Sequence, residues 1–120
     1  MKFISCRRFY IEKQLKLFFK NLCGNVLDVG GKKYNKRGNF SHLDYDKVNL
    51  TFLNIDYSTD PDILSTAENI PSKDNIYDAA LIIELLEHVE NPREVLKETY
   101  RVIKKDGIAL VTMPFMYPVH

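Results

Sequence analysis

Asp78-Ala79-Ala80-Leu81-Ile82-Ile83 is the stretch that decides the fold, because an unbroken apolar run follows a single acid. A strand that is apolar at successive positions is buried on both faces, which is typical of a central strand in a parallel sheet. Downstream, Asn91-Pro92 predict the start of a helix, since Asn caps helices well and proline fits the first helical position. We expect this helix to run to about Lys105 and a last strand to follow over 108–113.

Upstream of that stretch, shorter segments predict further strands. Val26–Gly31 is an apolar run closed by paired glycines, which indicates a buried strand that leads into a tight turn. Residues 51–56 alternate and end in an acid, whereas 32–50 predict a loop. Residues 62–64 are at most a very short strand, since the link at 57–61 is too short for a parallel crossover. Buried strands joined by long connections indicate a parallel α/β sheet.

Residues 3–22 carry apolar side chains at helical spacing among basic ones, which predicts an amphipathic helix that Gly24 ends. Two interpretations are open: the helix packs on the sheet of the domain, or it binds a membrane surface or a partner. We expect residues 1–120 to form one domain, with the helix in 1–24 and the core in 25–120.

The composition is that of an ordinary globular domain, with 120 residues, 45% hydrophobic and 28% charged. It excludes a wholly disordered chain, and no apolar run reaches the about 18 residues of a transmembrane helix. Charged residues interrupt the N-terminal segment, so we expect no signal peptide and a cytoplasmic protein. Cys6 and Cys23 are too few for a disulfide framework or a structural zinc site, and we expect no metal site.

The charge is unevenly distributed along the chain. Residues 1–38 hold ten Lys and Arg against two acids, although the net charge of the whole chain is only +1. A basic first third can attract nucleic acid, a membrane surface or an acidic small molecule. The alternative is that the basic and acidic parts pair on one surface. Because the basic residues are scattered, we expect no nucleic-acid binding.

Ligands on parallel α/β sheets bind beyond the carboxyl ends of the strands, so the residues there are the candidate site. Asp28 to Gly31 close a strand with an acid and two glycines, and glycine allows a ligand to approach the backbone closely. Asp56 ends the second strand, where a carboxylate can accept two hydrogen bonds from a ribose diol. The alternative for Asp56 is a cap or turn residue.

Four stretches together resemble the class I S-adenosylmethionine-dependent methyltransferases, and among them the small-molecule, type 11-like family. They are Val26–Gly31; Asn54–Asp56; Ala67–Pro71 with Tyr77–Ala80; and Glu84–Pro92 with Arg101–Gly107. The resemblance covers residues 25–118. It implies a Rossmann-like α/β fold, with a mostly parallel sheet and helices on both faces, and S-adenosylmethionine as the cofactor.

The resemblance also implies which residues bind the cofactor. They are Asp28, Gly30, Gly31 and Lys32 after the first strand; Asp56 and Tyr57 after the second; and Thr66, Ala67, Glu68, Ile83 and Glu84 around the fourth. Methyl transfer is a one-step displacement, in which a base is needed only if the acceptor must lose a proton. Glu84 and His88 are the candidate catalytic residues, and His120 is a further candidate.

Three departures from the family pattern leave questions open. Lys32 stands where the family usually has a glycine, so it could meet the carboxylate of the cofactor or block the loop. Thr66 stands where an acid is frequent, and a hydroxyl is a poorer acceptor for an amino group. We expect the sheet of these 120 residues to lack the last two strands of the family's seven-stranded sheet. The open edge that remains could pair two copies into a homodimer.

The expected function is methyl transfer from S-adenosylmethionine to a small molecule. The tail Pro114–His120 resembles enzymes that act on sugars or cell-envelope precursors. The alternative is a non-catalytic or truncated module of the same fold that serves binding or assembly. A nicotinamide-binding domain is disfavoured, because the third glycine of its motif and the helix directly after the turn are absent.

Overall fold

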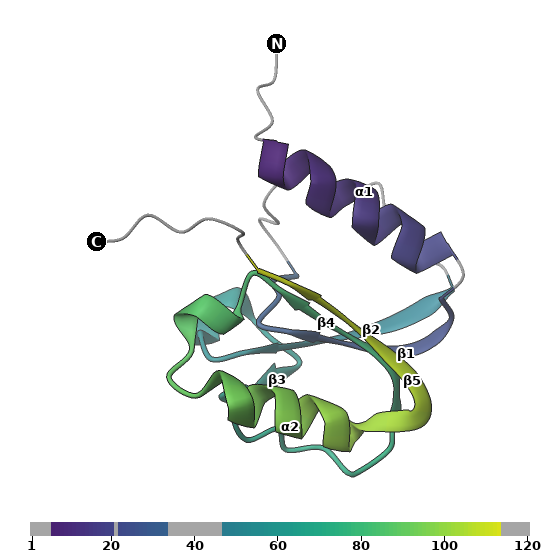
Figure 1. The fold of residues 1–120 in the computed structure, drawn as a ribbon. Coiled ribbons are helices and arrows are strands. Elements are labelled where there is room, and N and C mark those ends of the chain that lie inside the picture. The colour runs from purple at the N-terminus through teal and green to yellow at the C-terminus, as the bar shows by residue number, and fades with distance from the viewer. Residues whose placement is uncertain (1–5, 21, 34–46, 114–120) are drawn as a thin grey trace.

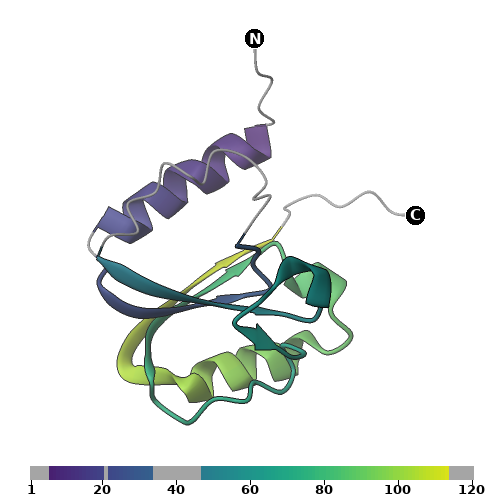
Figure 2. The same ribbon diagram turned by 180° about the vertical axis from the view of Figure 1, so that it is seen from behind.

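The computed structural model describes residues 6–20, 22–33 and 47–113 and shows a sheet between two helices (Figures 1 and 2). In chain order the elements are α1 (Cys6–Lys20), β1 (Gly24–Val29), β2 (Val48–Asn54), β3 (Ile63–Leu64), β4 (Tyr77–Ile83), α2 (Pro92–Val102) and β5 (Ile103–Thr112). The strands form one sheet in the order β3-β2-β1-β4-β5, and all neighbours are parallel. The expected Rossmann-like α/β fold is confirmed, and the described chain has no strand beyond β5.

The larger apolar cluster lies between the sheet and α2. It joins Leu27 and Val29 of β1 and Ala80 and Ile82 of β4 to Val95 and Val102 of α2. These side chains are almost fully buried because β1 and β4 are the two central strands. Successive side chains of a strand point to opposite faces, so the alternate residues of the same strands meet the other helix.

Helix α1 covers the opposite face of the sheet (Figures 1 and 2). Leu15 and Phe19 of α1, with Leu22 just after it, pack against Val26, Ala79 and Leu81 of β1 and β4. The predicted helix is confirmed, and the structure shows the interpretation in which it packs on the sheet. Its amphipathic pattern is weak, because apolar Tyr10 and Leu17 are exposed. Gly24 has the positive φ expected of it, +94°, but it does not cap the helix, because α1 ends at Lys20 and Gly24 is the first residue of β1. Among the described residues, no helix is both long and apolar enough to cross a membrane.

Helix α2 begins where the sequence predicts but ends earlier. The Asn91 side chain accepts a hydrogen bond from a first-turn N–H, and Pro92 occupies the first turn. The last residue of α2 is Val102 rather than Lys105, because Ile103 already has an extended backbone and its side chain is buried.

Strand β5 therefore begins at Ile103 and not at 108, with an irregularity in its first half. Its partners in the register are Tyr77 for Ile103 and Ala79 for Ile108, so the residues between them bulge out of the ladder. Gly107 permits this bulge, since a Cβ there would come within 2.8 Å of a carbonyl oxygen of β4. Gly107 thus serves the bulge in β5 and lies beyond the end of α2 at Val102.

Strands β2 and β3 pair in parallel although only residues 55–62 connect them, which corrects the expectation that such a link is too short. β3 is vestigial, as expected, with a length of 2 residues. Asp62 supports the pairing: one carboxylate oxygen accepts the Phe52 N–H at 2.8 Å, and the other lies 2.6 Å from Lys33 Nζ. Burial raises the pKa of Asp62, but these two partners outweigh burial and hold the pKa below its ordinary value.

Candidate functional site

The carboxyl ends of β1, β2 and β4 lie side by side on one edge of the sheet, because the three strands are adjacent and parallel. The glycine turn (Gly30–Lys32), the turn 55–60 and the segment Glu84–Val89 leave this edge. The loop 65–70 begins there too, since the Ser65 N–H donates to the last residue of β2 at 3.1 Å. The structure therefore brings the predicted segments to one edge.

Both glycines of the glycine turn are required by the fold. Gly30 has φ +83°, and a Cβ there would come within 2.8 Å of Leu85 from the segment after β4. A Cβ on Gly31 would collide with the carboxylate of Asp28, which is half-buried in β1. The Gly30 N–H joins the turn to β2 by donating to the Leu53 carbonyl oxygen at 2.7 Å. Asp28 thus lies against the turn and supports it.

Asp56 lies beyond β2, which ends at Asn54, and caps a short 3-10 turn over Tyr57–Thr59. Its Oδ1 accepts the Ser58 hydroxyl at 2.7 Å and the Ser58 N–H at 2.9 Å. These bonds, and then the charge of Lys32, lower the pKa of Asp56 below its ordinary value, so the carboxylate is ionised at neutral pH. Of the two sequence alternatives, the cap is observed. Within the described residues no hydrogen bond ends on Oδ2, which leaves that oxygen for a ligand.

Near the Asp56 carboxylate, two side chains are exposed and a third forms an ion pair with another residue. Lys32 is exposed, and Tyr57, directly after Asp56, is 81% exposed. Lys33 instead forms an ion pair with Asp62 on the β3 side of the sheet. A ligand at this edge would therefore meet one lysine of the pair and not both.

Asn54 is the residue of this edge whose role the sequence interpretation missed. Its side chain is buried, at 8% exposure. Its Nδ2 donates to the carbonyl oxygens of Gly30 at 3.2 Å and Gly31 at 3.0 Å, and its Oδ1 accepts the Asp56 N–H at 2.9 Å. The signal in the sequence is a lone amide at the end of an apolar strand, since a buried amide needs several hydrogen-bond partners.

The predicted cofactor-binding residues of the loop 65–70 differ in how accessible their side chains are to a ligand. Thr66 is exposed and Glu68 is half-buried, but Ala67 is buried in the α2-side cluster. The Thr66 carbonyl oxygen accepts the Asn69 N–H at 3.4 Å, which closes the loop as a turn. Ala67 could therefore contact a ligand only through its backbone.

Glu98 and Arg101 of α2 hold this loop, a role that the sequence interpretation did not include. Glu98 Oε2 accepts the Ile70 N–H at 2.8 Å, and the Arg101 guanidinium donates to the carbonyl oxygens of Ile70 and Ser72, each at 2.8 Å. Arg101 also donates to both oxygens of Glu98 at 2.9 Å. The hydrogen bonds from Arg101 hold the pKa of Glu98 below its ordinary value. The loop is thus fixed from the α2 side.

Glu84 follows β4 directly and has φ +51°, which is uncommon for a residue with a side chain. Such backbone strain clusters at functional sites. The Glu84 N–H donates to the carbonyl oxygen and to the hydroxyl of Thr112, each at 3.1 Å, and this ties the segment to β5. The preceding Ile83 packs toward α1, so its side chain lies on the opposite side from the α2 cluster.

His88 ends a short 3-10 turn over Leu86–His88, and its side chain is 65% exposed. Its Nε2 lies 3.7 Å from Oε1 of Glu87, whose side chain is only 11% exposed. Glu84 and His88 thus differ in environment, one half-buried and the other open to solvent. His120 lies outside the described residues. Across the described ranges, no group of three His, Cys, Asp or Glu could hold a metal ion.

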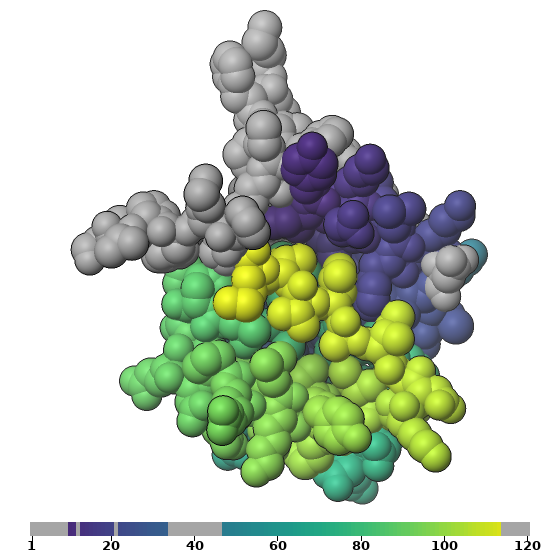
Figure 3. All heavy atoms as spheres, in the orientation of Figure 1, coloured from purple at the N-terminus to yellow at the C-terminus, as the bar shows by residue number. Residues whose placement is uncertain are grey.

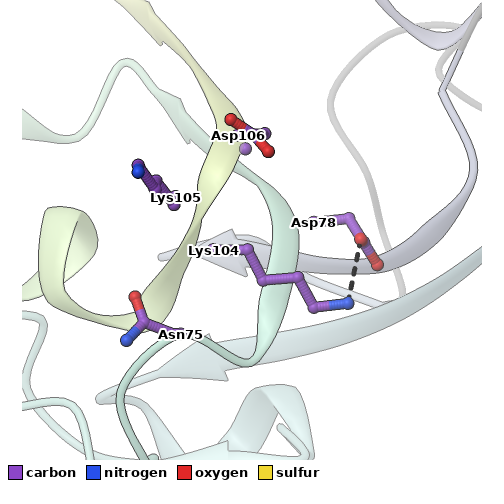
Figure 4. A pocket seen from close by; sticks show the side chains of 6 residues that line it. Asn75, Asp78, Lys104, Lys105 and Asp106 are labelled. Atoms are coloured by element: carbon purple, nitrogen blue, oxygen red, sulfur yellow. Dashed lines mark hydrogen bonds and ion pairs between the residues drawn. The ribbon is translucent and has the colours of Figure 1, made fainter.

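A shallow hollow of about 560 Å³ lies at the opposite edge of the sheet, where β4 and β5 begin (Figure 4). It is lined by Asn75, Asp78, Lys104, Lys105, Asp106 and Gly107. Asp78 accepts the Asn25 N–H at 2.8 Å and lies 3.1 Å from Lys104 Nζ, and these bonds hold the pKa of Asp78 below its ordinary value. Asp78 and Lys104 are therefore paired with each other, at the edge opposite to the strand-end residues.

Comparison with known proteins identifies one family. A family model described as a methyltransferase domain matches residues 22–111. An uncharacterised protein of Methanocaldococcus jannaschii is 37% identical over 49 residues, which are 41% of this chain and 24% of that protein.

Two solved structures share the fold. One, from Methanococcus maripaludis, is provisionally described as an S-adenosyl-L-methionine-dependent methyltransferase; it is 17% identical, with a TM-score of 0.68 over 88% of this chain and 54% of its own. Another, from Thermotoga maritima, is provisionally described as a histamine N-methyltransferase; it is 24% identical, with a TM-score of 0.57 over 82% of this chain and 49% of its own. This chain thus spans about half the length of these structures, and at these identities the likeness shows the fold alone.

Proposed function

Because the chain belongs to the methyltransferase-domain family, we propose that it binds S-adenosylmethionine at the carboxyl edge of β1, β2 and β4 and transfers its methyl group to a small molecule. The observation that carries the proposal is Asp56, an ionised and exposed carboxylate held beside the glycine turn. A ribose diol offers the hydroxyl donors that such a carboxylate accepts. The donor set of this edge therefore fits the nucleoside part of the cofactor.

Each segment of the edge has a proposed role in binding. Oδ2 of Asp56 accepts from the ribose hydroxyls, and the glycine turn lets the amino-acid part approach the backbone where no Cβ intervenes. Lys32 offers an exposed ammonium to the cofactor carboxylate. Tyr57, Thr66, Glu68 and the backbone of Ala67 contact the adenine side, and Asp28, Ile83 and Glu84 support the site through the turn and the end of β4.

When bound, S-adenosylmethionine supplies a methyl group activated for displacement. The chain contributes orientation and, where the acceptor must lose a proton, a base. Glu84 is half-buried and precedes Leu85, whose side chain lies against Gly30 of the glycine turn. His88 has an exposed imidazole. We propose these two residues as the catalytic candidates. The proposed acceptor is a sugar or a cell-envelope precursor, for which the support is the sequence of Pro114–His120 alone.

Titration of the protein with S-adenosylhomocysteine by calorimetry tests the cofactor site. Asp56→Asn should weaken binding about tenfold, because the neutral amide accepts less strongly and leaves ligand hydroxyls poorly paired. Asp60→Asn is the matched control, since Asp60 is also exposed and Asn tolerates its φ of +50°. No binding to the unmodified protein at millimolar ligand would refute the proposed function, and equal affinity in the Asp56 variant would remove that residue from the site.

A specific observation favours the second candidate, a module that serves binding or assembly. β5 is an outer strand of the described sheet, and Figure 3 shows it in yellow at the surface of the molecule. Ile108 and Val111 of β5 are exposed, as is Met113 directly after it. Unpaired strand edges template pairing with another chain. We propose that two copies pair through β5 into a homodimer. A monomer by sedimentation at every concentration tested would contradict this pairing, and Val111→Lys should abolish a dimer that does form.

Two further proposals concern the domain organisation and the cellular location. We propose that α1 and the sheet act as one domain over residues 1–120 and that the protein works in the cytoplasm. The packing of Leu15 and Phe19 onto the sheet supports the first of these. Limited proteolysis that released α1 from an intact core under native conditions would contradict the single unit.

A further inference from the structure

One buried amide connects the two halves of the proposed cofactor site. Asn54 ends β2, is 8% exposed and places its side chain between the glycine turn and the turn that holds Asp56. We propose that Asn54 is a positioning residue that holds the glycine turn and the Asp56 carboxylate as one preformed unit. The inference rests on the proposed function and deepens it. One side chain would connect the part of the site that binds the amino-acid half of the ligand to the part that binds the nucleoside half.

The geometry of the amide supports this role on the glycine side. Nδ2 donates to the turn twice, at 3.2 Å from the Gly30 oxygen and 3.0 Å from the Gly31 oxygen. No peptide bond of the described chain is cis, and a trans peptide directs its C=O and N–H oppositely. The N–H groups of Gly31 and Lys32 must therefore point away from Asn54. One side chain thus sets the direction in which the turn presents its donors.

The other end of the same amide acts on the ribose side. Oδ1 accepts the Asp56 N–H at 2.9 Å, which orients the residue whose carboxylate is proposed to bind the diol. This local bond from an Asn side chain to the backbone two residues on is an Asx turn. The main-chain oxygen of Asn54 also accepts the Ser65 N–H at 3.1 Å, so the loop 65–70 starts from the same residue.

The two ends of the amide can be separated by substitution. A serine hydroxyl makes the same local turn with the Asp56 N–H but is too short to reach both glycine carbonyls. In Asn54→Ser the ribose side should therefore persist while the glycine turn is released. Asn54→Asp is the second variant, since its carboxylate also keeps the local acceptor but cannot donate to the carbonyl oxygens. Asn49→Ser is the matched control, because Asn49 is an exposed residue of the same strand.

The test compares two ligands by calorimetry, adenosine and S-adenosylhomocysteine. Adenosine contains only the nucleoside half, and S-adenosylhomocysteine contains both. In Asn54→Ser the Kd of S-adenosylhomocysteine should rise about tenfold, the order expected for lost hydrogen bonds, while that of adenosine stays within about twofold. Asn49→Ser should leave both values unchanged. A merely structural role of Asn54 would lower the melting temperature and leave the ratio of the two Kd values as it is.

Amide hydrogen exchange of the ligand-free protein gives an independent readout. The Gly30 N–H, which donates to the Leu53 carbonyl oxygen, reports on the turn, and the Ser58 N–H reports on the Asp56 side. Faster exchange at Gly30 in Asn54→Ser, with exchange at Ser58 unchanged, supports the proposal; unchanged exchange at both positions overturns it. A ratio of Kd values that stays within about threefold of the unmodified protein in both variants also overturns it. If the unmodified protein binds neither ligand, the proposed function fails first and the assignment to a cofactor fails with it, whereas the exchange data still report whether Asn54 holds the turn.

Discussion

The two faces of the sheet are each covered by one helix, but the helices are attached in different ways. The contacts described between α1 and the sheet are apolar, from Leu15 and Phe19. α2 has a comparable apolar face and, in addition, the Glu98–Arg101 pair that bonds the loop 65–70. Apolar burial is non-directional, whereas hydrogen bonds fix the position of the groups that they join. The difference teaches that the face that also positions a site segment adds directional bonds to apolar burial.

The largest expected effect comes from breaking the directional bonds of α2. Arg101→Ala removes the partner of Glu98 and leaves the Ile70 and Ser72 carbonyl oxygens without their donor. We expect a loss of about 3 kcal/mol in the free energy of unfolding by urea, because two backbone carbonyl oxygens and one carboxylate lose their hydrogen-bond donor at once. Affinity for S-adenosylhomocysteine should fall as well, since the loop 65–70 is released. Arg93→Ala, an exposed arginine of the same helix, is the control.

If Arg101→Ala lost stability but kept its affinity for S-adenosylhomocysteine, the α2 bonds would serve folding alone. The contrast between the faces would then reduce to a difference in the number of contacts.

A smaller effect, confined to stability, is expected on the α1 face. Leu15→Ala empties a buried position at 3% exposure and should lower the free energy of unfolding by about 2 kcal/mol. We expect unchanged affinity for S-adenosylhomocysteine, because α1 contacts the sheet from the face opposite to α2. Leu17→Ala on the same helix, at 57% exposure, should change neither quantity. A weaker ligand affinity in Leu15→Ala would show that the two faces are coupled through the sheet.

The smallest effect is a change in the pH dependence of stability on the α2 side. Because Arg101 holds the pKa of Glu98 below its unfolded value, Glu98 contributes stability above that unfolded value, and the contribution is lost as pH falls through the folded one. Glu98→Gln should therefore flatten the decline of stability in the acid range, by less than about 1 kcal/mol in total. Urea unfolding at a series of pH values measures it. Glu90→Gln, at an exposed position, should keep the slope of the unmodified protein.

The placement of the candidate site at one edge of the sheet can be predicted from the sequence, because its residues follow strands directly. The glycine turn and Asp56 were located from their place after apolar runs, and they lie on one edge of the sheet as expected. The reading of Asp56 was incomplete, because whether an acid after a strand caps a turn or binds a ligand depends on which oxygen its neighbours occupy. Ser58 takes Oδ1 only, and no pattern of residue types shows that.

The sequence by itself determined the parallel sheet, the start of α2 and the turn after β1. Continuous apolar runs, an Asn-Pro pair and paired glycines act through burial and local backbone preference, which are readable along the chain. Only the tertiary structure decided that Ile103 leaves the helix for β5, that Asn54 joins the glycine turn to Asp56, and that Arg101 holds the loop 65–70. The Asn54–Gly31 and Arg101–Ile70 hydrogen bonds join residues that are 23 and 31 positions apart in the chain. Such pairs meet only when the sheet has assembled.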